Sequence, residues 1–216
     1  MSVWGAVVIG VLAGYLIGGV PFGIIVGRLA GVGDVRQAGS GKTGFTNSLR
    51  VMGWKWALLV VIGDTAKGVG AVLIGSALLD SPWAGAFAGV AAVLGHIFPV
   101  YAGFRGGRGV ATAFGAFLGV SWPAALVVVV FSLIILGIFR YASLMSVIGV
   151  FVGFVTVVAL VQTERLEAPY LVFAMLTMLA VEISHVGNIR RLIAGTEPKL
   201  GQGAHPSSGQ RPTGPH

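Results

Sequence analysis

The chain has 216 residues, of which 56% are hydrophobic and only 10% are charged, and its mean hydropathy is +0.92. A soluble domain carries about 25% charged residues, so this composition excludes a soluble globular protein and indicates an integral membrane protein. The absence of cysteine excludes disulfides, thiol catalysis and cysteine-ligated metals. Because each crossing takes about 20 residues, the length allows one helical bundle and no separate soluble domain.

Apolar runs predict seven transmembrane helices and therefore an all-α, polytopic fold. The expected spans are Val3–Val26, Trp56–Leu79, Trp83–Tyr101, Val110–Val120, Pro123–Phe139, Leu144–Val161 and Pro169–Ser184. The fourth run is too short to cross alone. Either it crosses where the bilayer is thinned or tilted, or it joins the fifth through a kink at Pro123, which would leave six spans. Residues 1–200 form the expected bundle, and the tail 201–216, rich in Gly, Pro and Ser, is expected to be disordered.

The distribution of basic residues predicts how the bundle is oriented. With seven spans, twelve of the fourteen Lys and Arg residues fall on one side of the membrane, in residues 28–55, 105–108, 140 and 190–211. The positive-inside rule then places the N-terminus outside and the C-terminus in the cytoplasm. The first span has no basic residue before it and no cleavage pattern, so a retained helix is expected and not a signal peptide. Its glycines 14, 18, 19 and 23 predict close helix packing.

The first of two glycine-rich polar segments is GSGKTGFTNSLR, at residues 39–50. Glycine N–H groups beside fixed positive charges can form a nest for phosphate oxygens, and Gly41 offers such a group. Ser40, Thr46 and Asn47 can add hydrogen bonds, and the planar guanidinium of Arg50 can bind two phosphate oxygens at once. The alternative is an ordinary cytoplasmic loop whose basic residues follow from the topology.

The Gly41-Lys42-Thr43 core of this segment suggests a nucleotide-binding P-loop, but the wider sequence argues against one. That motif requires a glycine where the chain has Arg36, and a strand before it. The apolar pattern shows no such strand. Nucleotide binding is therefore not expected.

The second segment, FRGGRGVAT at residues 104–112, follows an apolar span that ends near His96. Arg105 and Arg108, separated by Gly106 and Gly107, can converge on one dianion, and the helix that starts after them presents its positive N-terminal end. His96 is equally well explained as a packing histidine or as a substrate-facing one.

A third polar cluster closes the last span, where His185 and Asn188 are three residues apart and share one helical face. The histidine could move a proton or hold a hydroxyl, and the asparagine could orient the same group. The alternative is an ordinary interfacial helix end. Within the second span, Asp64 and Lys67 are expected to form a structural ion pair rather than to act in chemistry.

Taken in order, GSGKTGFTNSLR, GHIFPVYAGFRGGRGVAT and HVGNIRRLIAGTE resemble the three motifs of the bacterial acyl-phosphate:glycerol-3-phosphate acyltransferase family, the PlsY type. The resemblance covers nearly the whole chain except the tail. It implies acyl transfer from acyl phosphate to the 1-hydroxyl of glycerol 3-phosphate, giving lysophosphatidic acid and phosphate for phospholipid synthesis. It further implies a bacterial cytoplasmic membrane location, an active site facing the cytoplasm, and membrane lipid as a neighbour. No cofactor, metal, nucleotide or nucleic acid is implied.

The resemblance also implies roles for individual residues. Ser40, His185 and Asn188 are expected in catalysis, and the proton of the attacking hydroxyl goes either to His185 or to a phosphate oxygen of the donor. Thr46, Asn47, Arg50 and Arg108 are expected to bind phosphate together with Gly41, Arg105, Gly106 and Gly107, and Glu197 is expected to be structural. The chain departs from the family at three places. It has Lys42-Thr43 where the family commonly has Asn-Pro, and Arg105 and Arg108 where lysines are usual. It also has Ser184 where the family often has a basic residue. Arginine holds a phosphate differently from lysine.

Two other classes of function are compatible with the composition. A transporter or exchanger of phosphorylated small molecules would need polar groups on broken helices at the middle of the membrane, accessible from both sides. Here the polar clusters gather at one predicted face, which disfavours transport. A membrane scaffold would leave three clusters suited to anions unexplained.

Overall fold

The computed structural model describes residues 2–78 and 80–202, so the predicted tail 201–216 lies almost entirely outside the described residues. The described residues are helical and contain no strand. The longer helices are α1 (Val3–Gly18), α4 (Trp54–Leu73), α5 (Pro82–Ile97), α6 (Val110–Val120), α7 (Trp122–Phe139), α8 (Ala142–Gln162) and α9 (Pro169–Ser184). The short ones are α2 (Phe22–Leu29), α3 (Phe45–Met52), α10 (Val186–Ile193), the 3-10 turns η1 (Val35–Gln37) and η3 (Val100–Ala102), and a π-helical turn η2 (Ile74–Leu78).

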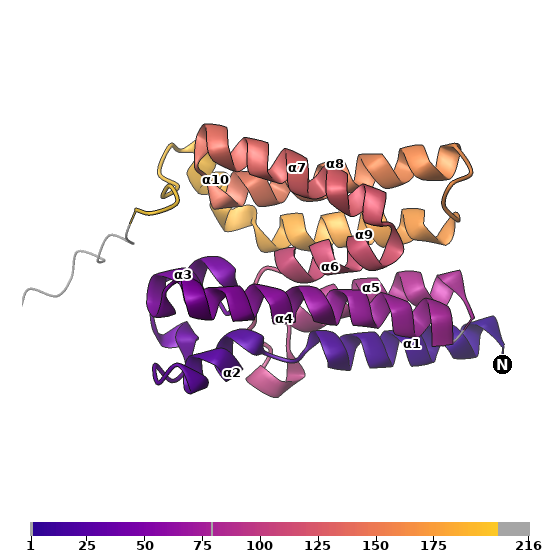
Figure 1. The fold of residues 1–216 in the computed structure, drawn as a ribbon, viewed down its shortest axis with the longest axis horizontal. Coiled ribbons are helices and arrows are strands. Elements are labelled where there is room, and N and C mark those ends of the chain that lie inside the picture. The colour runs from indigo at the N-terminus through magenta and orange to yellow at the C-terminus, as the bar shows by residue number, and fades with distance from the viewer. Residues whose placement is uncertain (1, 79, 203–216) are drawn as a thin grey trace, which may run out of the picture.

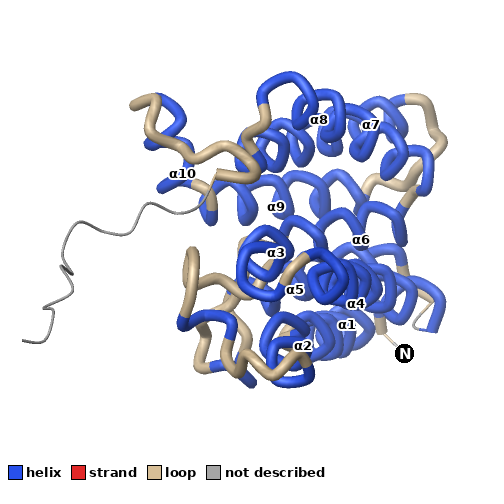
Figure 2. Tube along the Cα trace, turned by 60° about the vertical axis from the view of Figure 1, so that its left-hand side comes forward, coloured by secondary structure: helices blue, strands red, loops and turns tan. Residues whose placement is uncertain are grey.

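The helices pack side by side in a bundle whose two flanks are α1 and the α7–α8 pair (Figure 1). Helix α1 packs on α5, α4 packs on α5 and α6, and α9 packs on both α5 and α8. The short helices α2, α3 and α10 gather at one end of the bundle, and the N-terminus lies at the other end (Figures 1 and 2). The first and third polar segments, which contain α3 and α10, therefore lie at one end of the molecule.

Five helical segments of the described chain are long and apolar enough to cross a membrane: Val3–Leu29, Trp54–Ala77, Pro82–Ala102, Trp122–Phe139 and Ala142–Gln162. Helices α9 and α10 together form a sixth candidate, bent by 61° where they meet. Helix α6 has the predicted bounds but only 11 residues, hence a length of about 16 Å against an apolar thickness of about 30 Å. The count of seven crossings stays a prediction.

The structure decides how α6 relates to α7. Extended Ser121 separates the two helices, and its hydroxyl caps α7 by accepting the N–H of Ala124 at 3.4 Å. Pro123 lies in the first turn of α7, where a proline is tolerated because its missing N–H would have no helical partner. The alternative of a single span kinked at Pro123 is therefore wrong, and α6 is a separate, short helix.

The predicted first span, Val3–Val26, is divided in the structure. Helix α1 ends at Gly18, and α2 begins at Phe22 after Pro21. Proline has no N–H and disfavours helical geometry in the preceding residue, so Pro21 accounts for the break. The carbonyl of Val20, freed from the helix, accepts a hydrogen bond from Lys67 Nζ at 3.0 Å.

Glycines bring α1 into close contact with α5. A β-carbon built on Gly14 would collide with the backbone of Ala88, and one built on Gly18 would collide with Ala92. The predicted packing role of these two glycines is confirmed. Small residues at such crossings let helix backbones approach in an apolar environment, where packing and not water drives association.

Candidate active site

A cavity of about 1350 Å³ lies between α3, α4 and α6 on one side and α7, α8 and α10 on the other. Its polar end is lined by Ser40, Lys42, Thr46, Asn47, Arg50, Arg108, His185, Asn188, Arg191 and Glu197. Its apolar part is lined by Val61, Ile62, Val110, Phe114, Phe117, Val128, Val129, Leu133, Met145 and Val150. Three segments that are distant in the sequence thus meet at one cavity, which joins a basic region to an apolar one.

Asn47 organises the first segment from within. Its Oδ1 accepts the N–H of Ser40 at 2.7 Å, and its Nδ2 lies 2.9, 3.1 and 2.9 Å from the carbonyl oxygens of Val35, Ala38 and Lys42. The side chain is almost fully buried, although it borders the cavity. Both of its polar atoms are occupied by its own loop, so the structure supports loop organisation and not the predicted phosphate contact.

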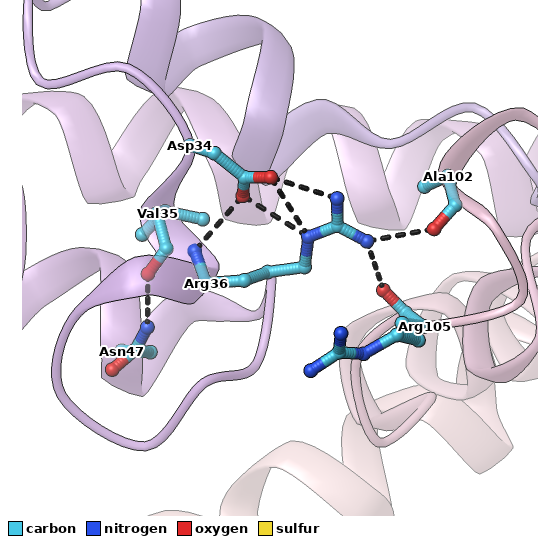
Figure 3. Close-up of polar contacts among 6 residues, drawn as sticks. All are labelled: Asp34, Val35, Arg36, Asn47, Ala102 and Arg105. Atoms are coloured by element: carbon cyan, nitrogen blue, oxygen red, sulfur yellow. Dashed lines mark hydrogen bonds and ion pairs between the residues drawn. The ribbon is translucent and has the colours of Figure 1, made fainter.

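Arg36 connects the first polar segment to the second (Figure 3). Its Nη1 donates to the carbonyl oxygens of Ala102 at 2.7 Å and Arg105 at 2.9 Å. Asp34 holds the same guanidinium through Nη2 at 2.7 Å and Nε at 3.0 Å. The hydrogen bonds from Arg36 lower the pKa of Asp34, so its carboxylate stays charged. The sequence did not predict this bridge, because it presented Arg36 only as a basic residue of the cytoplasmic side and as a mismatch to the P-loop glycine.

The glycines of the two segments do not form the predicted phosphate nest. The N–H of Gly106 donates to the Ile97 carbonyl at 3.2 Å, and that of Gly107 donates to the His96 carbonyl at 3.1 Å. The N–H of Gly41 donates to a carbonyl of its own loop at 3.3 Å. None of the three glycines lines the cavity. The N–H groups of all three are occupied by the fold. Gly106 and Gly107 allow close approach to His96, and Gly41 adopts a positive φ of 68° that favours glycine.

The two arginines of the second segment have different surroundings. Arg108 lines the cavity, whereas Arg105 is exposed and does not line it. Burial lowers the pKa of Arg108, and the positive charge of Arg191 adds to this effect while Glu197 offsets part of it. Because a guanidinium stays protonated, the cost of its burial is relieved by binding an anion and not by losing a proton.

Two helix N-termini supply the positive backbone groups that the glycine nest was expected to provide. Helix α3 begins after Gly44 and α6 begins after Gly109, and neither has a side-chain cap. Both N-terminal turns line the cavity. Uncapped helix N-termini carry unsatisfied N–H groups and a partial positive charge, so they favour an anion. Arg108 places a full charge beside the N-terminus of α6, and Arg50 in the last turn of α3 adds a second charge to the cavity lining.

His185 lies at the 61° bend between α9 and α10 and is only 1% exposed. Its Nδ1 lies 2.8 Å from the carbonyl oxygen of Val181. A carbonyl can only accept, so Nδ1 carries the ring hydrogen and donates it, which leaves Nε2 as the acceptor of a neutral imidazole. The residue lines the cavity, where such an acceptor can hold a hydroxyl.

Glu197 holds the third segment together. Its carboxylate accepts hydrogen bonds from Ser143 Oγ at 2.6 Å, Asn188 Nδ2 at 2.7 Å and Arg191 Nε at 2.8 Å. Burial alone would raise the pKa of Glu197, but these three bonds outweigh burial and lower it. Asn188, predicted to act in catalysis, therefore has its amide nitrogen committed to Glu197.

The predicted ion pair between Asp64 and Lys67 is confirmed, with 2.8 Å between Oδ1 and Nζ. His96 joins it, since its Nδ1 lies 2.9 Å from Lys67 Nζ. In residues 2–78 and 80–202, no group of three or more His, Cys, Asp or Glu side chains is placed to hold a metal ion.

The fold and the cavity define a polytopic helical membrane protein with a binding site suited to an anionic molecule that carries an apolar chain. The sequence profile of glycerol-3-phosphate acyltransferases matches residues 8–195. The chain therefore belongs to the glycerol-3-phosphate acyltransferase family.

Individual relatives agree with this assignment. The glycerol-3-phosphate acyltransferase of Synechococcus sp. (strain JA-3-3Ab) is 43% identical over 202 residues, which are 94% of this chain and 97% of the relative. The glycerol-3-phosphate acyltransferase of Rhodospirillum rubrum is 44% identical over 205 residues, which cover 91% of this chain and 93% of the relative.

Two solved structures share the fold. The crystal structure of PlsY, an integral membrane glycerol 3-phosphate acyltransferase in its glycerol 3-phosphate form, matches with a TM-score of 0.83 and 36% identity, covering 90% of this chain and 96% of that one. The crystal structure of its lysophosphatidic acid form matches with a TM-score of 0.81 and 34% identity, and the match covers 90% of this chain and 95% of that one.

Proposed function

We propose that this protein transfers a fatty acyl group from acyl phosphate to the 1-hydroxyl of glycerol 3-phosphate, producing lysophosphatidic acid and inorganic phosphate. One observation carries the proposal: a single cavity joins a basic polar end to an apolar part between α4, α6, α7 and α8. Both substrates bear a phosphate, and the donor also bears a chain that needs an apolar environment.

The positive groups are suited to two phosphates. Arg108 directly precedes the N-terminus of α6, and Arg50 lines the same cavity from the last turn of α3. Each arginine can form a bidentate pair with phosphate oxygens, and each helix end adds N–H donors. Ser40 and Thr46, whose hydroxyls make no hydrogen bond within the described chain, supply further donors at the same end.

The reaction itself is a displacement at the acyl carbonyl. The 1-hydroxyl oxygen attacks the carbonyl carbon, the bond from that carbon to the bridging phosphate oxygen breaks, and phosphate leaves with the bonding electrons. Arg108 would stabilise the charge that develops on the leaving phosphate. Because phosphate is a good leaving group, positioning of the two substrates contributes much of the rate.

His185 is proposed to hold the attacking hydroxyl through Nε2, since Nδ1 is committed to the Val181 carbonyl. The proton then goes to Nε2 or to an oxygen of the leaving phosphate.

The variant His185→Ala distinguishes the two routes. A loss of about 10²-fold or more in kcat fits a histidine base, and a smaller loss confined to KM fits transfer to phosphate. Asn188, held by Glu197, is proposed to support this region of the site.

The proposed location is the bacterial cytoplasmic membrane, with the polar end of the cavity facing the cytoplasm and the apolar part within the lipid. The basic residues at that end agree with the positive-inside rule. This orientation would give glycerol 3-phosphate access from water and let the acyl chain enter from the membrane.

Purified protein in detergent, supplied with acyl phosphate and glycerol 3-phosphate, should release phosphate and form lysophosphatidic acid.

Arg108→Ala should lower kcat/KM by about 10²-fold or more while the protein stays folded, because a charge that stabilises the transition state is lost. Acyl-CoA in place of acyl phosphate should give no product. Absence of turnover together with flux of glycerol 3-phosphate into vesicles would refute the acyltransferase and favour transport.

A further inference from the structure

A buried cluster of ionisable side chains, formed by Asp64, Lys67 and His96, lies between α4 and α5 and has no part in the chemistry proposed above. Lys67 Nζ lies 2.8 Å from Asp64 Oδ1, 2.9 Å from His96 Nδ1 and 3.0 Å from the Val20 carbonyl oxygen. All three side chains are at most 5% exposed. Ionisable groups inside a membrane protein are costly and generally mark a functional element.

The contacts of Lys67 fix the protonation of the His96 ring. An ammonium group has three hydrogens and no acceptor, and its three close partners match its three donors. His96 Nδ1 also lies 3.3 Å from Asp64 Oδ1, but its contact with Lys67 Nζ is shorter, at 2.9 Å, so Nδ1 accepts from Lys67 and the ring hydrogen lies on Nε2. The carboxylate of Asp64 balances the ammonium, so the cluster is neutral as a whole and leaves no uncompensated charge in the bundle.

The Nε2 edge of His96 lies directly against the glycine pair that precedes Arg108. A β-carbon built on Gly107 would collide with Nε2, and one built on Gly106 would collide with the His96 carbonyl oxygen. That carbonyl also accepts the N–H of Gly107 at 3.1 Å. The side chain and the backbone of His96 thus both hold the loop from which Arg108 reaches the cavity. On the far side, Ser184 Oγ donates to the Arg108 carbonyl at 2.9 Å.

We propose that the Asp64–Lys67–His96 cluster positions Arg108 for phosphate binding. Lys67 ties α4 to the break between α1 and α2 and holds the His96 ring, and the ring sets where Gly107 and the next residue lie. His96 and Asp64 also line the cavity, and His96 is assigned here as a positioning residue that acts through Arg108. This inference rests on the proposed binding of phosphate by Arg108.

Binding of inorganic phosphate to the full-length protein in detergent, measured by calorimetry, tests the inference without an acyl donor. His96→Asn keeps a short polar group near Lys67 but removes the ring edge at Gly107. We expect its phosphate Kd to rise about 10-fold, with a melting temperature within a few degrees of wild type, because a displacement of about 1 Å is enough to weaken such a site. The matched control is Thr177→Val. Thr177 is fully buried in α9, its hydroxyl has no partner in the described chain, and it does not line the cavity. The phosphate Kd of Thr177→Val should therefore equal that of the wild type.

A double-mutant cycle tests whether His96 acts through Arg108. If it does, His96→Asn combined with Arg108→Ala binds phosphate no more weakly than Arg108→Ala alone. Losses that multiply would overturn the inference, as would an unchanged Kd in His96→Asn. His96→Gln extends an amide to the position of Nε2 and should recover phosphate binding to within about threefold of wild type, since it restores a group of similar reach beside Gly107.

A spectroscopic measurement on the wild-type protein tests the same inference and does not depend on whether a variant folds. Imidazole ¹⁵N spectra should show the His96 hydrogen on Nε2 and an unprotonated Nδ1, and a ring protonated on Nδ1 would overturn the inference. Absence of phosphate binding to wild type would overturn it together with the phosphate role of Arg108. Wild-type phosphate binding without turnover on acyl phosphate would refute only the donor assignment and leave the inference standing.

Discussion

The assignment of Asn47 as the organiser of its loop can be tested with Asn47→Asp, which preserves the shape of the side chain. The carboxylate can still accept the Ser40 N–H, but the oxygen that replaces Nδ2 has no hydrogens and faces carbonyl oxygens at 2.9 to 3.1 Å. Two donated hydrogen bonds are lost at about 1 kcal/mol each, and repulsion in a buried site adds about 1 kcal/mol more. The loop should therefore lose about 3 kcal/mol, which corresponds to opening about 10²-fold more often.

Hydrogen exchange of the amides in residues 34–44 measures this opening directly, and phosphate calorimetry measures the site at the same time. Gln37→Glu is the matched control, because it makes the same amide-to-carboxylate change in the same loop at an exposed side chain. We expect fast exchange and weak phosphate binding in Asn47→Asp, and wild-type behaviour in Gln37→Glu. Weak phosphate binding with unchanged exchange would refute the reasoning and return Asn47 to the predicted role of phosphate ligand.

Further predictions concern Glu197, Arg36 and Phe117. The folded-state pKa of Glu197 lies below its ordinary value of 4.5, so its stabilisation is present above about pH 4.5 and is lost as the pH falls through the folded-state value. Melting temperatures should show this acid loss in the wild type and not in Glu197→Gln. Arg36→Ala breaks the bridge between the two loops and should raise the KM for glycerol 3-phosphate about 10-fold. Arg36→Lys should not restore it, because a compact ammonium lacks the planar guanidinium whose Nε and Nη2 hold Asp34 while Nη1 reaches the two carbonyls. Phe117→Ala enlarges the apolar part of the cavity, so the ratio of kcat/KM for longer to shorter acyl phosphates should rise.

The limits of the helices could be predicted where apolar runs end at polar or capping residues. Helices α6 and α9 have the predicted bounds, because Gly109 and Ser121 flank the first and Ser184 closes the second. The break in the first span was predictable in principle from Pro21, since a proline and the residue before it both disfavour a continuous helix. The break does not change the number of candidate spans, since Val3–Leu29 as a whole is still one segment long and apolar enough to cross a membrane.

The roles of the polar residues could not be assigned from their types alone. Asparagine and glycine suit an anion site, but they suit a tightly folded loop equally well, and only the positions of the surrounding carbonyl groups decide between the two. Asn47 and Gly107 satisfy such carbonyls, which lie up to twelve residues away in the sequence. Arg108 and His185 both line the cavity, and their predicted roles there stay predictions.

The polar residues of the three segments thus divide into two sets with different physical tasks. One set, which includes Asn47, Glu197 and His96, makes its hydrogen bonds to the protein and fixes the loops. The other set, which includes Arg50 and Arg108, keeps its charge for a ligand and has little to hold it in place by itself. A charged group binds an anion strongly only if its position is fixed beforehand, because otherwise ordering it costs part of the binding free energy. Changes in the first set should therefore weaken phosphate binding and loop stability together, whereas changes in the second should weaken phosphate binding alone.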